Sequence, residues 1–227
     1  MSLNRPSQSR MKLADSQRHG VGCELLLVEG DSAAHAATAV RDARTQAVLA
    51  CQGKPLNAWR AHPDKVATHA LYAQLAEAMG WASAVQTEPA AASAPRYERL
   101  VLLFDPDADG IHIGALLLLY LQRFAPALLA DGRVWMVRAP MGAWRVADGE
   151  SGEITEQLAY SPDQLRQWRD AARADGAVVM GDSVFRGLGS LPPELLRSSC
   201  VAPATRRADR VTPAQMQAVI DMFGGAG

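Results

Sequence analysis

The chain alternates short continuous apolar runs with longer stretches in which apolar residues recur at helical spacing. A short run of this kind is typical of a strand that is buried on both faces of a sheet. Four such strands are predicted, at 25–28, 47–50, 99–104 and 132–140. Helices are predicted between them, at 32–43, 64–79 and 111–129.

Strands that alternate with helices indicate an α/β fold with a mostly parallel sheet, flanked by helices that make right-handed crossovers. The pattern changes after the fourth strand. There follow a polar hairpin-like stretch at 147–157, a helix at 162–174, and a strand, Gly-rich turn and Pro-initiated helix within 178–199. A short last helix would begin after Thr212 as its N-cap.

These patterns divide the chain into three parts. Residues 1–22 are predicted to be a flexible or partner-dependent lead, residues 23–145 the core, and residues 146–227 a small C-terminal α+β segment. The Ala- and Pro-rich stretch at 87–95 is predicted to be a surface loop or linker.

Composition narrows the class of protein. The 227 residues are 48% hydrophobic and carry a net charge of -1, which suits one medium domain with at most a smaller attachment. A nucleic-acid site would therefore have to be a local patch. Three scattered cysteines without a C-x-x-C pair favour the reducing cytoplasm. The N-terminus has no secretory pattern. The longest apolar stretch, 111–130, is interrupted by polar residues and a proline too often to span a membrane.

Three aspartates on alternate positions follow the strand at 99–104, and Gly110 comes directly after them. The same residue pattern begins a calcium-binding EF-hand loop. That loop needs a glutamate where this chain has Leu116, and it follows a helix where this chain has a predicted strand. A solvated acidic turn would explain one or two of the three acids. Asp105, Asp107 and Asp109 together would repel one another, and a divalent cation such as Mg²⁺ would relieve that repulsion.

A second acid occupies the same kind of position. Glu29 follows the apolar run at 25–28 and precedes the predicted helix at 32–43. Open α/β sheets place ligands at the carboxyl ends of their strands. If these two strands are neighbours, Glu29 and the three aspartates meet at one edge of the sheet.

Five motifs occur in order along the chain and together resemble one family. They are KLADSQ (12–17), ELLLVEGDSA (24–33), QAVLACQGKPLNAW (46–59), LLFDPDADGIHI (102–113) and FRGLGSLPPELL (185–196). The acidic motifs resemble the Toprim domain of topoisomerases and primases. The set as a whole resembles the B subunits of the bacterial type IIA topoisomerases, gyrase and topoisomerase IV, and implies a Rossmann-like Toprim core with the tail segment of such a subunit.

The resemblance implies a role for each motif residue. Glu29 would be a metal ligand and the general acid/base, Asp105 and Asp107 would hold Mg²⁺, and Asp109 would support that site. Lys54, Asn57 and Arg186 fall where the family contacts DNA. Arg186 stands where the family usually has lysine, and the two cations differ in geometry.

Other positions depart from the family pattern. Ala34 and His35 replace two glycines, Gly114 follows the HI pair where the family has arginine, and Ser190 and Pro192 change GLGEMN to GLGSLP. His35 and His112 are interpreted as packing or hydrogen-bonding residues, because imidazole is uncommon around Mg²⁺.

The family's ATPase and transducer domains have no counterpart here, and only about ten residues precede KLADSQ. We therefore expect no ATP to be bound. The family's attacking tyrosine lies in the A subunit, and none of the tyrosines here matches its motif. The leading expectation is a stand-alone B-like protein that binds Mg²⁺ and DNA and supports cleavage and religation beside an A subunit. The alternatives are a non-catalytic module that binds the A subunit or its DNA, an independent Toprim nuclease, and a truncated gene or fragment.

Overall fold

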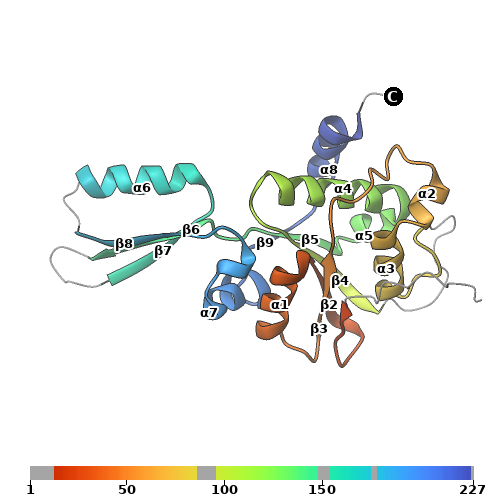
Figure 1. Ribbon diagram of the computed structural model, residues 1–227, viewed down its shortest axis with the longest axis horizontal. Helices are drawn as coiled ribbons and strands as arrows, with labels where there is room; N and C mark the ends of the chain where they lie inside the picture. Colours follow the sequence, from red (N-terminus) through yellow and green to blue (C-terminus); the bar gives the residue numbers. More distant parts are fainter. Residues whose placement is uncertain (1–12, 86–95, 148–153, 175–177, 226–227) are drawn as a thin grey trace, which may run out of the picture.

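The computed structural model describes residues 13–85, 96–147, 154–174 and 178–225 (Figure 1). The predicted loop at 87–95 lies outside the described residues. A six-stranded sheet forms the centre of the larger body and runs in the order β1-β3-β2-β4-β5-β9. Its strands are β1 (Leu13–Ala14), β2 (Gly20–Glu29), β3 (Gln46–Cys51), β4 (Tyr97–Leu103), β5 (Val134–Val137) and β9 (Ala208–Arg210).

The four inner strands of this sheet are parallel, and the two edge strands are antiparallel to them. Every residue of β3 is buried, and so are the residues from Cys23 to Val28 of β2, which explains their continuous apolar runs. The predicted α/β class and the mostly parallel sheet are confirmed.

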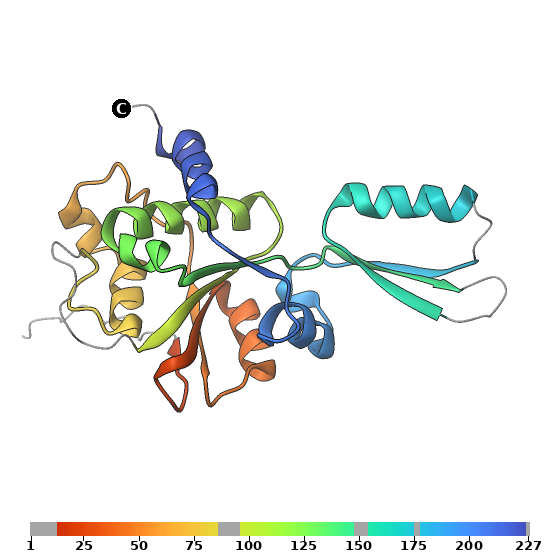
Figure 2. The ribbon, with the colours of Figure 1, turned by 180° about the vertical axis from the view of Figure 1, so that it is seen from behind.

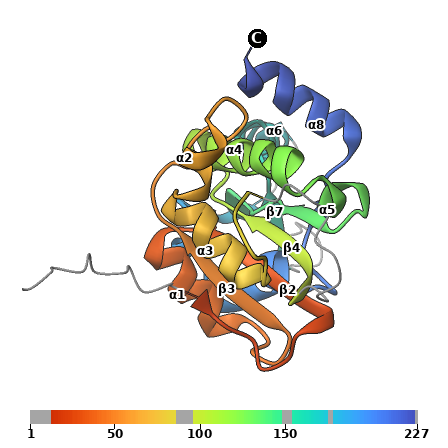
Figure 3. The same ribbon diagram turned by 90° about the vertical axis from the view of Figure 1, so that its right-hand side faces the viewer.

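Helices cover both faces of the sheet (Figures 1 and 3). One core contains side chains of α3 (Ala70–Met79), α4 (Ala108–Phe124), α5 (Pro126–Ala130) and α8 (Pro213–Val219). The other contains side chains of α1 (Gly30–Val40), α7 (Pro193–Leu196) and the helical turn η2 (Arg197–Val201).

Two of the predicted long helices are each two helices in the structure. The stretch 64–79 divides into α2 (Pro63–Ala67) and α3, and the stretch 111–129 divides into α4 and α5. The second break has a clear cause, because Pro126 has no backbone N–H and cannot continue α4. The helix α4 also starts three residues earlier than predicted, where Asp107 caps it.

A separate small sheet stands away from the larger body in Figures 1 and 2. It comprises β6 (Gly142–Ala147), β7 (Ile154–Ala159) and β8 (Val178–Val184) in the antiparallel order β7-β6-β8, together with α6 (Pro162–Ala174). We call this group the outlying unit. After it the chain returns to the larger body, where β9 joins the main sheet and α8 packs on α4.

This arrangement differs from the predicted division at residue 145. The boundary at 145/146 falls inside β6, and the predicted C-terminal segment contains both the outlying unit and parts of the main body. Sequence patterns could not find this division, because β9 is only three residues long and has no apolar run of its own. None of the helices among the described residues combines the length and apolarity needed to cross a bilayer.

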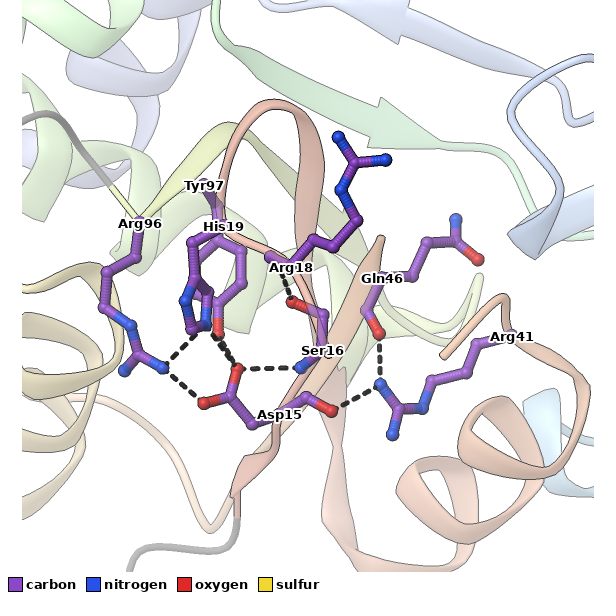
Figure 4. A network of polar contacts seen from close by, with 8 residues as sticks. All are labelled: Asp15, Ser16, Arg18, His19, Arg41, Gln46, Arg96 and Tyr97. Carbon is purple, nitrogen blue, oxygen red and sulfur yellow. Dashed lines mark hydrogen bonds and ion pairs between the residues drawn. The ribbon is translucent and has the colours of Figure 1, made fainter. Parts of the chain in front are cut away.

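The predicted flexible lead also differs from the structure at residues 13–22, which belong to β1, the following turn and β2. Figure 4 shows the reason: the carboxylate of Asp15 accepts hydrogen bonds from the Tyr97 hydroxyl at 2.6 Å and the Ser16 N–H at 2.7 Å, and also contacts His19 and Arg96. Burial alone would raise the pKa of Asp15, but these four partners outweigh it and lower the pKa to about 2.

A buried ion pair joins the middle of β2 to the returning C-terminal part. Glu24 is only 2% exposed, and both of its carboxylate oxygens accept hydrogen bonds at 2.7 Å from the guanidinium of Arg206. Gln46 donates a further bond at 3.0 Å. Burial would raise the pKa of Glu24, but Arg206 and Gln46 hold it below its ordinary value.

We expect Arg206→Ala to lower the free energy of unfolding by about 3–5 kcal/mol at pH 7, because it removes the main partner of a buried charge and leaves Glu24 only Gln46 and the more distant Arg99. Chemical denaturation measures this. Since the folded pKa of Glu24 is depressed, the pair's contribution is present above the ordinary value of 4.5 and is lost as the pH falls through the folded pKa. The control is Arg44→Ala, which removes an exposed ion pair with Asp42 and should cost less than about 1 kcal/mol.

Candidate metal centre

The acidic residues meet where two parallel strands end side by side. Val28 of β2 is paired with Leu103 of β4, so the residues that follow each strand leave the sheet at the same edge. Glu29 is the last residue of β2, and Asp105 comes two residues after the end of β4. The two strands are thus neighbours, which is the condition that the sequence analysis set for the two acidic motifs to meet.

Glu29 lies among acidic neighbours. Among the described residues none donates a hydrogen bond to its carboxylate. Partial burial raises the pKa of Glu29, and the nearby charges of Asp105, Asp107 and Asp109 raise it further, while Lys54 acts in the opposite direction. A partly buried carboxylate with a raised pKa beside other acids is a common feature of functional sites.

The three aspartates have different local roles. Asp105 is half-buried, and its pKa is raised by burial and by Asp107. Asp107 caps α4, because its Oδ1 accepts a hydrogen bond of 2.8 Å from the Gly110 N–H. Asp109 lies exposed in the first turn of α4, where its Oδ1 is 2.7 Å from the Lys54 Nζ. This pairing lowers the pKa of Asp109.

Gly110 is needed for steric reasons. A Cβ at this position would lie 2.1 Å from the carbonyl oxygen of Asp105, so no other residue fits without moving the backbone. The glycine after the third aspartate therefore allows the turn from β4 into α4 to close tightly, and this keeps Asp105 and Asp107 near Glu29.

A third segment also reaches this site. It is the turn that follows β8, the last strand of the outlying unit. The turn at 186–190 places the N–H of Leu188 2.7 Å from the Oδ1 of Asp105. Sequence reasoning assigned this motif only a DNA contact and missed its hydrogen bond to Asp105. Its one available signal was the pair of glycines in FRGLGS, because a backbone donor has no side-chain signature.

The residues predicted to contact DNA are placed differently from one another. Lys54 lies at the acidic edge through its pairing with Asp109, and its side chain is 54% exposed. Arg186 is exposed on the turn beside Asp105. Asn57 is engaged elsewhere: its amide donates to the carbonyl of Phe223 at 3.2 Å and its oxygen accepts from the Trp59 N–H at 3.1 Å. In this arrangement Asn57 ties the C-terminal helical turn η3 (Ile220–Gly224) to the loop after β3.

The donor set suits Mg²⁺, although within the described ranges no cluster of three or more His, Cys, Asp or Glu side chains is arranged to hold a metal ion. Mg²⁺ typically takes one or two carboxylates and completes its shell with water and phosphate oxygens. Glu29, Asp105 and Asp107 offer only oxygen ligands, and the raised pKa values of Glu29 and Asp105 mark a site whose negative charge a cation would offset.

Comparison with known proteins agrees with the arrangement of these motifs. The family described as the Toprim domain matches residues 24–139, which is half of the chain and contains both acidic motifs. The chain belongs to the Toprim family. Its fold also matches a crystal structure of the Plasmodium falciparum topoisomerase II DNA-binding, cleavage and re-ligation domain, with a TM-score of 0.64 and 22% identity over 87% of this chain and 26% of that one.

Curated relatives of this Toprim protein are the B subunits of bacterial topoisomerases. The B subunit of DNA gyrase from Thermotoga maritima is 32% identical over 88% of this chain, and the B subunit of DNA topoisomerase 4 from Haemophilus influenzae is 32% identical over 83%. The matched part spans only 30% and 28% of those two proteins.

Two departures from the family pattern, at Gly114 and Ser190, have a structural setting in this Toprim protein. Gly114 is buried in α4, where a Cβ would contact Phe104 and Met136, so the position faces the core. The Ser190 hydroxyl accepts from the Arg186 N–H at 3.0 Å and donates to the Gly187 carbonyl at 2.7 Å, which closes the turn beside Asp105. His112 packs against Phe223, in agreement with its predicted packing role.

In the absence of divalent metal, Glu29→Gln should raise the melting temperature at pH 8. The folded pKa of Glu29 lies above its ordinary value of 4.5, so the wild-type side chain costs no stability below pH 4.5 and becomes costly as the pH rises through the folded pKa. The corresponding gain in the free energy of unfolding should be less than about 1 kcal/mol, because the side chain is partly solvated. This gain should disappear near pH 4. Thermal melts of both proteins from pH 4 to 8 measure it, and a gain that persists at pH 4 contradicts the prediction.

Proposed function

We propose that this chain supplies the Mg²⁺-dependent half of a DNA cleavage and religation centre, and that a topoisomerase A subunit supplies the attacking tyrosine. The observation that carries the proposal is the meeting of Glu29 with Asp105 and Asp107 at one edge of the sheet, where these acids raise the pKa of Glu29 and no described residue donates a hydrogen bond to it. The similarity to gyrase and topoisomerase IV B subunits over most of the chain supports the same interpretation.

In this proposal Glu29 moves the proton. The pKa of Glu29 is raised, which moves it toward the pH at which the protein works. A carboxyl group with such a pKa can accept a proton from an attacking hydroxyl and return one to a leaving oxygen. Asp105 and Asp107 hold the cation, and bound Mg²⁺ would stabilise negative charge on the oxygens of the scissile phosphate. The exposed Lys54 would exchange its partner Asp109 for a DNA phosphate.

The tyrosines of this chain are engaged in its own structure, which supports a nucleophile from another subunit. The hydroxyls of Tyr72, Tyr97 and Tyr120 each donate a hydrogen bond within the body. Burial raises the pKa of all three, so none is activated as a nucleophile. Tyr160 lies under the Arg207 guanidinium, 4.5 Å from it. The three cysteines, all free and buried, fit the reducing cytoplasm that we propose as the location.

The deciding experiment is cleavage of supercoiled plasmid by this chain together with a gyrase or topoisomerase IV A subunit and Mg²⁺. Glu29→Gln should reduce the rate of cleavage by about 100-fold or more, because it removes the proton-transferring group and keeps its size. Glu77→Gln is the matched control, since Glu77 is an exposed acid on α3, away from the acidic motifs, and should cleave like wild type.

The same assay separates the other functions considered above. Cutting by this chain without an A subunit would support a Toprim nuclease. Binding to an A subunit that is unchanged by Asp105→Asn, with no cleavage by the wild type, would support a non-catalytic module. If wild type and Glu29→Gln are equally inactive and neither binds an A subunit, the proposed function is wrong.

Lys54 should contribute to DNA affinity through a phosphate contact. We expect Lys54→Ala to weaken binding of a short duplex and to reduce the slope of log affinity against log salt by about 1. Fluorescence anisotropy across a salt series measures both. The control is Lys65→Ala, an exposed lysine on α2. An unchanged slope for Lys54→Ala would remove this contact from the proposal.

A further inference from the structure

The turn at 186–190 lies against both acidic motifs at once. A Cβ on Gly187 would lie 2.4 Å from the Oδ2 of Asp105, and a Cβ on Gly189 would lie 2.5 Å from the Oγ of Ser32. Neither glycine has a backbone conformation that other residues avoid. Close approach to the two strand ends is therefore the physical reason for a glycine at each position.

Leu188 between these glycines is fixed in place. Its side chain is 1% exposed and belongs to the same core as Leu26 and Val28 of β2. Its N–H lies 2.7 Å from the Oδ1 of Asp105. A backbone donor whose own side chain is anchored in the core has little freedom to follow a moving carboxylate, so it defines where that carboxylate stays.

We propose that the Leu188 N–H is a positioning group, which holds the Asp105 carboxylate in the orientation that binds a divalent cation beside Glu29. Gly187 and Gly189 allow the approach, and the Ser190 hydroxyl closes the turn that presents the donor. This inference rests on the proposed function, because it concerns the same cation.

In this arrangement a metal ligand is oriented by its own hydrogen-bond partner. A metal-binding carboxylate is fixed by donors outside the metal shell, and loss of such a donor commonly costs about 10–100-fold in metal affinity. The Leu188 bond also favours the charged form of Asp105 and opposes the effects of burial and of Asp107. Because the backbone N–H is neutral, it can orient the Asp105 carboxylate without adding a positive charge that would compete with the cation.

The test measures Mg²⁺ affinity from the increase in melting temperature across a Mg²⁺ titration. Gly187→Ala should raise the half-saturating Mg²⁺ concentration by about 10-fold or more. Ser190→Ala should raise the half-saturating Mg²⁺ concentration by a smaller factor, and it replaces Gly187→Ala as the test if that variant does not fold. Ser190→Thr, which keeps the hydroxyl, should restore the wild-type concentration. Gly181→Ala, in the strand β8 that leads into this turn, is the matched control, because its Cβ would meet nothing within 4 Å.

A second readout follows the hydrogen bond itself. The Leu188 amide proton, observed by NMR, should exchange with solvent faster in Asp105→Ala than in wild type, and at the wild-type rate in Asp109→Ala, whose carboxylate pairs with Lys54 instead. A merely structural turn would show no change in the half-saturating Mg²⁺ concentration of Gly187→Ala and Ser190→Ala.

The outcomes separate the two proposals. If the wild type responds to Mg²⁺ and both Gly187→Ala and Ser190→Ala respond at the same concentrations, the positioning role is wrong and the proposed function stands. If the wild type shows no response to Mg²⁺, the proposed function and the positioning role both fail. An Asp105→Ala variant in which the Leu188 amide exchanges as in wild type also overturns the positioning role.

Discussion

The parallel pairing of β2 with β4 is the constraint on which the acidic edge depends. Val28 lies beside Leu103, so both strands release their next residues on the same side of the sheet. A change of register by one residue would turn every buried side chain of one strand toward the other face, and the two cores would not tolerate this. The positions of Glu29 and Asp105 are therefore set by the packing of apolar residues that have no part in the chemistry.

The two glutamates of β2 show how differently the same side chain can be treated on one strand. Glu24 is fully buried, and two arginines and a glutamine surround its carboxylate, so its pKa is depressed. Glu29 is only partly buried and has acids for neighbours, so its pKa is raised. The first arrangement stabilises a charge permanently, and the second leaves a charge that a cation or a proton can satisfy.

The sequence allowed the fold class and the acidic edge to be predicted because both follow from local patterns. Apolar runs identify the buried strands, and an acid placed directly after each run identifies the edge. Glu24 gave no such signal, since its partner Arg206 is 182 residues away. The Leu188 contact is made by the backbone, and the engagement of Asn57 depends on the return of the C-terminal helix, so neither could be found from residue type.

The division into a main body and an outlying unit was also beyond local patterns. The order of the patterns along the chain predicted a core followed by a tail segment. In the structure, however, the main sheet takes its last strand from residues 208–210. Tertiary pairing of a three-residue strand, rather than any propensity, decides this boundary.

The ion pair between Glu24 and Arg206 has a consequence for the order in which the chain is made. During synthesis Glu24 of β2 emerges before the guanidinium that makes its two short hydrogen bonds, because Arg206 follows 182 residues later, a delay of roughly 10–40 s at ordinary rates of translation. Gln46 likewise bonds the carbonyl of Val201, from the same late segment. Until its last strand is nearly complete, the nascent sheet therefore holds this buried charge with only Gln46 and the more distant Arg99, and a ribosome that stalls before Arg206 leaves a chain in which burial of β2 costs more.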